Sequence, residues 1–182
     1  MADSLKPYTM ITDFITGEEI PNVGAEENRQ AVEHFLVEEK GYLKAEIEID
    51  AEIEIIVAGE VYTSQIDLIV SLNDRTTRLM AIKCAAGSLG SREREILAAA
   101  RLFDENYQIP FSVVSDGKTA ILLDTVSGKK VGEGMDAIPS KAEAHEKLRS
   151  VVLQPFPKER REREKLIFRT YDSMNVNVQR NL

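Results

Sequence analysis

Asp67 and Lys83 are the two residues whose types and spacing could do chemistry together. Asp67 lies in the apolar run VYTSQIDLIVS (61–71) and Lys83 in the run RLMAIKC (78–84), separated by a polar turn signal. Such a pair of runs predicts a β-hairpin. Opposed side chains of paired antiparallel strands point to the same side. Burying the more apolar faces together therefore puts Asp67, Ala81 and Lys83 on one side, which requires an odd-length loop or a bulge.

A carboxylate and an ammonium group that converge beside a small side chain could form an active site. On a half-exposed sheet face, the same pair is more often a plain ion pair worth up to about 1 kcal/mol. The residues alone favour the ion pair. The neighbouring Cys84 falls on the apolar face of the hairpin, where a core thiol is expected rather than a nucleophile.

Two elements that precede the hairpin can be inferred from periodicity. Apolar residues at helical spacing predict a helix over about 25–40 that ends at Gly41. Residues 45–57 alternate between apolar and acidic side chains, which predicts a strand. Its acidic face is expected to be solvated rather than to bind a cation, since metal ligands converge from several elements. The expected apolar face consists of Ile47, Ile49, Ala51, Ile53 and Ile55.

The segment after the hairpin predicts a crossover connection. A helix is expected over about 92–105, with Ser91 as its N-cap, followed by a strand at 111–115. A helix in this place makes the strands at 78–84 and 111–115 parallel. A further strand at 119–125 follows an Asp-Gly turn, and the next stretch, SGKKVGEG, is rich in turn formers.

This order of elements predicts an α/β fold, bordering on α+β, with a central mixed sheet flanked by helices. We expect an irregular N-terminal arm (1–24), one domain (25–140) and a C-terminal helical appendage (141–182). The appendage contains a predicted short helix at 141–150 and the run KERREREKLIFR (158–169), with six bases and three acids. That run is expected to be a solvated helix with internal ion pairs, with nucleic-acid or partner binding as the less favoured interpretation.

The formal net charge of −8 is unevenly distributed along the 182 residues. Residues 1–60 hold 15 acids and 4 bases, whereas residues 61–182 hold 16 acids and 19 bases. This charge disfavours a general DNA coat protein, but a local basic face can still bind DNA. The more basic part contains Lys83, Arg92 and Arg94, which could present a surface to phosphates.

Composition also limits the class of protein. A single cysteine excludes an internal disulfide framework and a cysteine-rich zinc site. No apolar run approaches the roughly 18–20 residues that span a bilayer, and the N-terminus lacks the pattern of a signal peptide. The expectation is a cytoplasmic protein with no membrane partner.

The run from Glu26 to Gly117 resembles the N-terminal nuclease domain of type I restriction enzyme R subunits, within the PD-(D/E)xK nuclease superfamily. The resemblance rests on EENRQAVEHFLVEEKGY, QIDLIV, LMAIKC, a following helix and VVSDG, in that order. It implies a restriction-endonuclease-like core that cleaves DNA with magnesium or manganese.

The resemblance also implies roles for individual residues. Asp67 matches the family's magnesium ligand, and Lys83 matches the lysine that orients the attacking water or stabilises charge on the phosphate. Glu26 matches an acidic residue of the first helix that acts as an accessory metal ligand. Members of the family often carry a polar residue on the helix after the lysine. Arg94 and Glu95 lie at about that position in this sequence, and the match is loose.

Ala81 departs from the family pattern, because the E-x-K signature reads Ala81-Ile82-Lys83. A methyl group cannot bind magnesium, which takes oxygen ligands. The favoured hypothesis is therefore a degenerate, non-cleaving domain for nucleic-acid binding or assembly. The alternatives are a magnesium-dependent deoxyribonuclease that uses Asp67 and Lys83 with Glu26 as a relocated carboxylate, and an oligomeric scaffold, such as a homodimer, without a nucleic-acid role.

Overall fold

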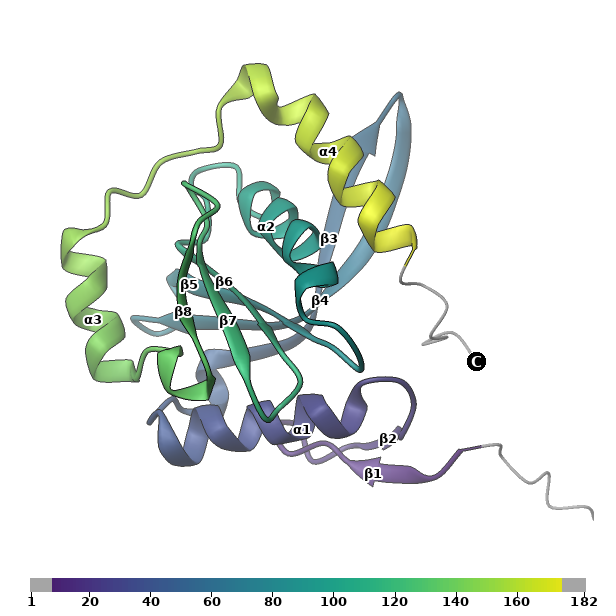
Figure 1. Cartoon of the computed structure of the whole chain (residues 1–182), viewed down its shortest axis with the longest axis vertical. Coiled ribbons are helices and arrows are strands. Elements are labelled where there is room, and N and C mark those ends of the chain that lie inside the picture. Colours follow the sequence, from purple (N-terminus) through teal and green to yellow (C-terminus); the bar gives the residue numbers. More distant parts are fainter. Residues whose placement is uncertain (1–7, 175–182) are drawn as a thin grey trace, which may run out of the picture.

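The computed structural model describes residues 8–174, with a six-stranded sheet at its centre (Figure 1). The strand order is β3-β4-β5-β6-β7-β8, and neighbours are antiparallel except for the parallel pair β5–β6. This confirms the predicted mixed sheet and the predicted parallel pairing. The strands are β3 (Ile47–Val57), β4 (Glu60–Leu72), β5 (Thr77–Cys84), β6 (Phe111–Ser115), β7 (Ala120–Asp124) and β8 (Lys130–Glu133).

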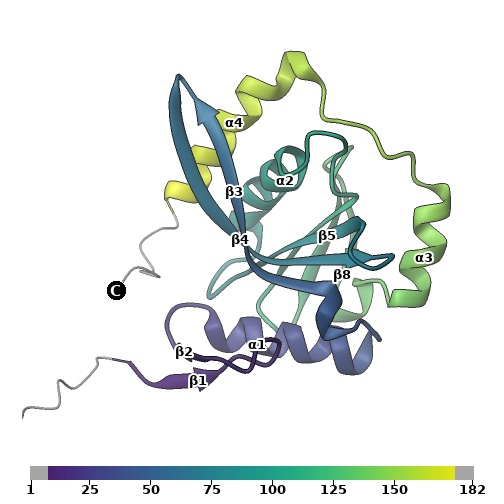
Figure 2. The same cartoon turned by 180° about the vertical axis from the view of Figure 1, so that it is seen from behind.

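Helices cover both faces of the sheet and separate two hydrophobic cores (Figures 1 and 2). On one face lies α1 (Glu26–His34), which continues as the π-helical turn η1 (Phe35–Glu39) before Gly41 ends it. The helix α3 (Lys141–Ser150) packs against the same core through Ala144. The helices α2 (Glu93–Leu102) and α4 (Lys158–Ser173) cover the other face. The connecting 3-10 turns are η2 (Lys44–Glu46), η3 (Gly90–Arg92) and η4 (Met135–Ala137).

The start of α2 corrects one expectation. The helix begins only after η3, so Arg92 takes the N-cap position and no side chain caps the helix. The hydroxyl of Ser91, the predicted cap, donates instead to the backbone oxygen of Ser88. The extra 3-10 turn therefore places Ser91 one residue too early to act as a cap.

The sequence suggested an irregular segment before α1, but part of this segment forms regular structure. β1 (Met10–Thr12) and β2 (Glu19–Pro21) form a short antiparallel hairpin. Between them, the buried carboxylate of Asp13 accepts the backbone N–H groups of Ile15 and Thr16. It also accepts a hydrogen bond from Gln30 of α1, so that one side chain shapes the turn and fixes the hairpin to the helix.

β3 does not present one continuous apolar face. Ile47 and Ile49 pack in the core under α1, whereas the apolar residues from Ala51 onward pack in the core under α2 and α4. The change occurs at Asp50, whose φ of 49° is left-handed, a conformation that aspartate tolerates better than most residues. The alternation predicted the strand correctly but was wrong about a single apolar face, because this residue turns the strand over.

The helix α4 is less solvated than its charged sequence suggested. Its half-buried Lys165 and exposed Glu162 form an internal ion pair, as expected. Glu164, Phe168 and Asp172, however, are buried, and Phe168 belongs to the core under α2. Within residues 8–174, no helix has the length and apolar character needed to cross a membrane.

Candidate functional site

The β4–β5 hairpin brings Asp67 and Lys83 to the same side of the sheet. The pairing register shifts by one residue near the turn, so that Leu79 of β5 has no partner in the ladder. Beyond this bulge the register sets Asp67 opposite Lys83, which confirms the predicted geometry. Ala81 is on their side. Strict alternation along β5 would place Leu79 there too, but the bulge turns it into the other core.

Lys83 lies between two buried carboxylates. Its Nζ is 3.0 Å from Oε1 of Glu95 on α2 and 3.8 Å from Oδ2 of Asp67, and its side chain is 18% exposed. Arg92 adds a second cation, with its guanidinium nitrogen 3.9 Å from Oε2 of Glu95. We name these four residues the Lys83 cluster. The cluster contains two positively and two negatively charged side chains, so its formal charges cancel.

The Glu95 carboxyl is under opposing electrostatic influences. Burial raises its pKa, Lys83 lowers it, and the nearby Asp172 and Asp67 raise it further. Its ion pair with Lys83 is therefore the contact that favours the ionised form. A buried carboxylate in this setting is costly without such a partner.

Asp67 is also tied to the backbone of β5. Its Oδ2 accepts the N–H of Cys84 at 2.7 Å. The thiol of Cys84 is buried, and burial raises its pKa well above the usual range, in agreement with the expected core thiol. This hydrogen bond fixes the Asp67 carboxylate at the end of β5.

Ala81 is fully buried and packs in the core under α2. Its methyl group points to the side that carries Asp67 and Lys83, at the position where the resemblance implies a glutamate. The hairpin thus has the predicted orientation but lacks a ligand at this place.

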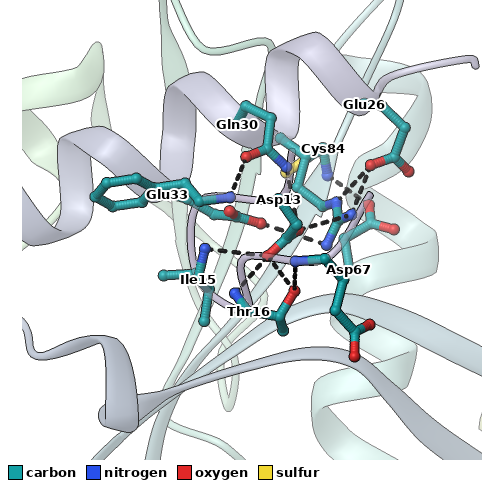
Figure 3. A network of polar contacts seen from close by, with 11 residues as sticks. Asp13, Ile15, Thr16, Glu26, Gln30, Glu33, Asp67 and Cys84 are labelled. Carbon is teal, nitrogen blue, oxygen red and sulfur yellow. Dashed lines mark hydrogen bonds and ion pairs between the residues drawn. The ribbon is translucent and has the colours of Figure 1, made fainter. Parts of the chain in front are cut away.

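Glu26 belongs to a second charged cluster, which surrounds Arg29 of α1 (Figure 3). Its Oε2 accepts hydrogen bonds from Nε and Nη2 of Arg29, at 2.8 and 2.6 Å. Arg29 also forms ion pairs with Asp13 at 3.2 Å and with Glu33 at 3.3 Å. We name these four residues the Arg29 cluster. Its buried cation holds one oxygen of Glu26 through two donors and joins α1 to the N-terminal hairpin.

Glu33 is the most perturbed acid of the Arg29 cluster. It is fully buried, and burial raises its pKa to about 8, against the lowering effect of Arg29 and with help from Asp13 and Glu26. Arg29 and the backbone N–H of Ile15 lower the pKa of Glu33, and burial outweighs both. Burial therefore favours the neutral form of Glu33, and the contact with Arg29 favours the carboxylate.

The donor set does not fit a magnesium site built on Asp67 and Glu26. Magnesium is usually bound by one or two carboxylates together with waters and phosphate oxygens. Ala81 supplies no donor, Arg29 holds Glu26, and the ammonium group of Lys83 already lies between Asp67 and Glu95. In residues 8–174, no group of three or more His, Cys, Asp or Glu side chains is arranged to hold a metal ion.

The sequence-predicted residues divide as follows. Asp67 and Lys83 come together, Arg92 joins them through Glu95, and Arg94 is exposed to solvent. Glu26 belongs to the Arg29 cluster on α1, which lies beside Asp67 and Cys84 (Figure 3). The sequence placed Glu95 only loosely, although one signal was available. Glu95 immediately precedes an apolar run, Ile96 to Ala100, and so falls on a buried turn of the helix.

The mixed sheet, the crossover helix and the Asp67–Lys83 pair define a restriction-endonuclease-like α/β domain. The chain belongs to the family described as the type I restriction enzyme R protein N terminus, whose family model matches residues 24–139. No curated protein and no solved structure was found to match the chain. The matched segment contains the six-stranded sheet with α1 and α2, while β1, β2, α3 and α4 lie outside it.

Proposed function

We propose that this protein is a non-cleaving member of its family that binds DNA beside the Lys83 cluster. The observation that carries the proposal is the buried methyl group of Ala81, with the charge of Lys83 balanced by Asp67 and Glu95. Metal-dependent hydrolysis of a phosphodiester needs a cation that activates water and neutralises the charge on phosphate. The present donor set does not fit such a cation.

Support for DNA binding comes from the first turn of α2. The backbone N–H of Glu93, the first residue of α2, donates to the oxygen of Gly90, so the support comes from side chains and not from helix N–H groups. Arg92 and Arg94 lie at the same end, where Arg94 is exposed and Arg92 is partly exposed. Phosphate groups could therefore approach this end of the helix although the whole protein is acidic.

The cleavage half of the proposal is tested with supercoiled plasmid over a range of magnesium and manganese concentrations. We expect no nicked or linear product from the wild type or from Lys83→Ala. Cleavage by the wild type that Lys83→Ala abolishes would show that the site is an active nuclease.

The binding half is tested by mobility shift of a short DNA duplex at several salt concentrations. We expect Arg92→Ala/Arg94→Ala to weaken binding and to reduce the salt slope by about 1–2, since each lost phosphate contact lowers it by about 0.9. Arg149→Ala, an exposed arginine on α3, serves as the control. No binding at low salt would leave assembly, for example as a homodimer, as the role of the domain.

A second candidate is a magnesium- or manganese-dependent deoxyribonuclease in which Glu95 replaces the missing carboxylate. The observation that favours it is the position of Glu95, whose Oε1 lies 3.0 Å from Lys83 on the side that carries Asp67. Loss of measurable plasmid cleavage in Glu95→Gln, with folding retained by circular dichroism, would establish this candidate. An inactive wild type excludes it.

A further inference from the structure

The guanidinium group of Arg29 lies where buried acids converge, and each of its three nitrogen atoms contacts a carboxylate (Figure 3). Nε and Nη2 donate to Oε2 of Glu26 at 2.8 and 2.6 Å. Nη2 also lies 3.2 Å from Oδ2 of Asp13, and Nη1 lies 3.3 Å from Oε1 of Glu33. The side chain of Arg29 is only 2% exposed, so protein groups and not solvent compensate its charge.

The acids of the Arg29 cluster differ in how much they need this cation. A buried carboxylate is costly unless it is paired or protonated. Burial favours the neutral form of Glu33. Burial also acts to raise the pKa of Asp13, but its hydrogen bonds and the charge of Arg29 lower that pKa below its usual value. Asp13 is therefore an ionised acid that depends on Arg29, and Glu26 is bound to the same cation by two donors.

The Arg29 cluster borders the end of β5. Figure 3 shows Asp67 beside it. Asn28, on the same helix, donates from Nδ2 to the backbone oxygen of Ala85 at 2.7 Å, and so holds α1 against the residue that follows β5. Glu26 and Asp67 are the two residues for which the resemblance implies a magnesium ion. The cation that the structure places next to them is instead a side chain of α1.

The contacts of Nη2 show how one cation serves two acids. Oε2 of Glu26 and Oδ2 of Asp13 both lie within 3.2 Å of this single atom. One or two carboxylates are also what magnesium usually takes from a protein. A guanidinium group is always charged and offers five N–H donors, so it can satisfy the same carboxylates without water. A divalent cation would have to displace a group that is covalently part of the helix.

We propose that Arg29 is a built-in substitute for a divalent metal ion. Its guanidinium group supplies the positive charge that Glu26 and Asp13 require, and it closes this place to divalent cations. The inference concerns the charge balance of the fold and does not depend on DNA binding. It predicts that a divalent cation gains a binding site only when the guanidinium group is removed.

Thermal unfolding of the full chain with and without manganese tests the substitution. Arg29→Ala alone leaves three buried acids without a cation, so the variant to use is Arg29→Ala/Glu33→Gln, which keeps Asp13 and Glu26 as the acids. We expect manganese at about 100 times its dissociation constant to raise the melting temperature of this double variant by about 5–10 °C. The wild type and Glu33→Gln should not respond. Addition of Glu26→Gln to the double variant should abolish the effect.

Two results for the double variant would overturn the proposal. One is a folded protein that manganese does not stabilise, and the other is a protein that stays unfolded at every manganese concentration, since the metal then cannot replace the guanidinium group. Stabilisation of the wild type by manganese that Glu26→Gln abolishes would overturn it too. If Glu95→Gln abolishes such stabilisation instead, the ion binds at the Lys83 cluster, which contradicts the proposed function and leaves the role of Arg29 to be decided by the double variant.

Discussion

The raised pKa of Glu33 has consequences for the pH dependence of stability. In the unfolded chain a glutamate titrates near 4.5, whereas in the fold the pKa of Glu33 is about 8. Between these values the folded state keeps a proton that the unfolded state releases. The free energy of unfolding contributed by this residue therefore falls as pH rises through that window, and the loss is complete above about pH 8.

Glu33→Gln tests this behaviour, since glutamine resembles the protonated acid and does not titrate. We expect the variant to gain stability relative to the wild type as pH rises from about 5 to 8, by an amount on the order of a few kcal/mol. Urea unfolding at several pH values measures the difference. Unfolding free energies that run parallel at all pH values would contradict a protonated Glu33.

Other residue-scale features show where the sequence was sufficient. The apolar pattern of the hairpin predicted that Asp67 and Lys83 share a side and that a bulge or an odd loop is needed. The pattern could not show that Asp50 adopts a left-handed conformation, because the alternation of apolar and acidic residues does not depend on the φ angle of a single residue. The i,i+3 spacing of Glu26 and Arg29 on the predicted helix allows them to pair, but the sequence could not show that Asp13 of the N-terminal hairpin joins them.

At the scale of elements, the packing of α1 against the β6–β7 turn depends on Gly117. This glycine has a φ of 82°, and a Cβ atom there would lie 2.8 Å from Cβ of Ala31 and 3.1 Å from the backbone oxygen of Asn28. A side chain at this position would therefore force α1 away from the sheet.

Gly117→Ala should lower the free energy of unfolding by about 2–4 kcal/mol, the combined effect of left-handed strain and steric overlap. Gly59→Ala is the matched control, because Gly59 has a φ of 83° and open space around it. The control should cost only about 1–2 kcal/mol. Chemical denaturation measures both, and an equal loss in the two variants would show that the contact with α1 can relax.

Most elements were predictable because their periodicity is long and regular, as in α1, α2 and the β4–β5 hairpin. Besides β1 and β2, the sequence missed β8, which lies in a stretch rich in Gly and Lys that was expected to form turns. Gly132 sits close to Ala137, where a Cβ atom would come within 2.7 Å, so its glycine serves packing rather than a turn. Tertiary contact, which no local pattern contains, decides such a strand.

At the scale of the whole molecule, β3 forms an edge of the sheet. A long edge strand offers unpaired backbone groups to other chains, and charged side chains are a common protection against such pairing. Glu52 and Glu54 are exposed at alternating positions of β3. We infer that these acids keep the edge from pairing with a second molecule.

The double variant Glu52→Thr/Glu54→Thr should therefore associate as its concentration rises, since threonine favours strands and carries no charge. Size-exclusion chromatography with light scattering detects the change in mass. Glu146→Thr/Glu159→Thr alters the net charge equally at exposed helix positions and should behave as the wild type does. Association of both variants to the same extent would attribute the effect to net charge rather than to the edge.

The segments on either side of the family-matched region each contribute a buried aspartate, Asp13 before it and Asp172 after it. Asp13 of the N-terminal hairpin pairs with Arg29, which holds Glu26, and Asp172 of α4 lies near Glu95. The acidic character of the chain thus extends to the surroundings of the site.

The bulge at Leu79 also affects which deletions the hairpin would tolerate. Without Leu79, the ladder that begins at Thr77 would continue without interruption, and Lys83 would still stand opposite Asp67. The loss of that codon would remove a buried side chain but preserve the alignment of the pair. The loss of Ile82 instead would place Lys83 one step nearer the turn and rotate its ammonium group into the opposite core. Deletion of the Leu79 codon therefore keeps Asp67 aligned with Lys83, whereas deletion of the Ile82 codon, three positions later, does not.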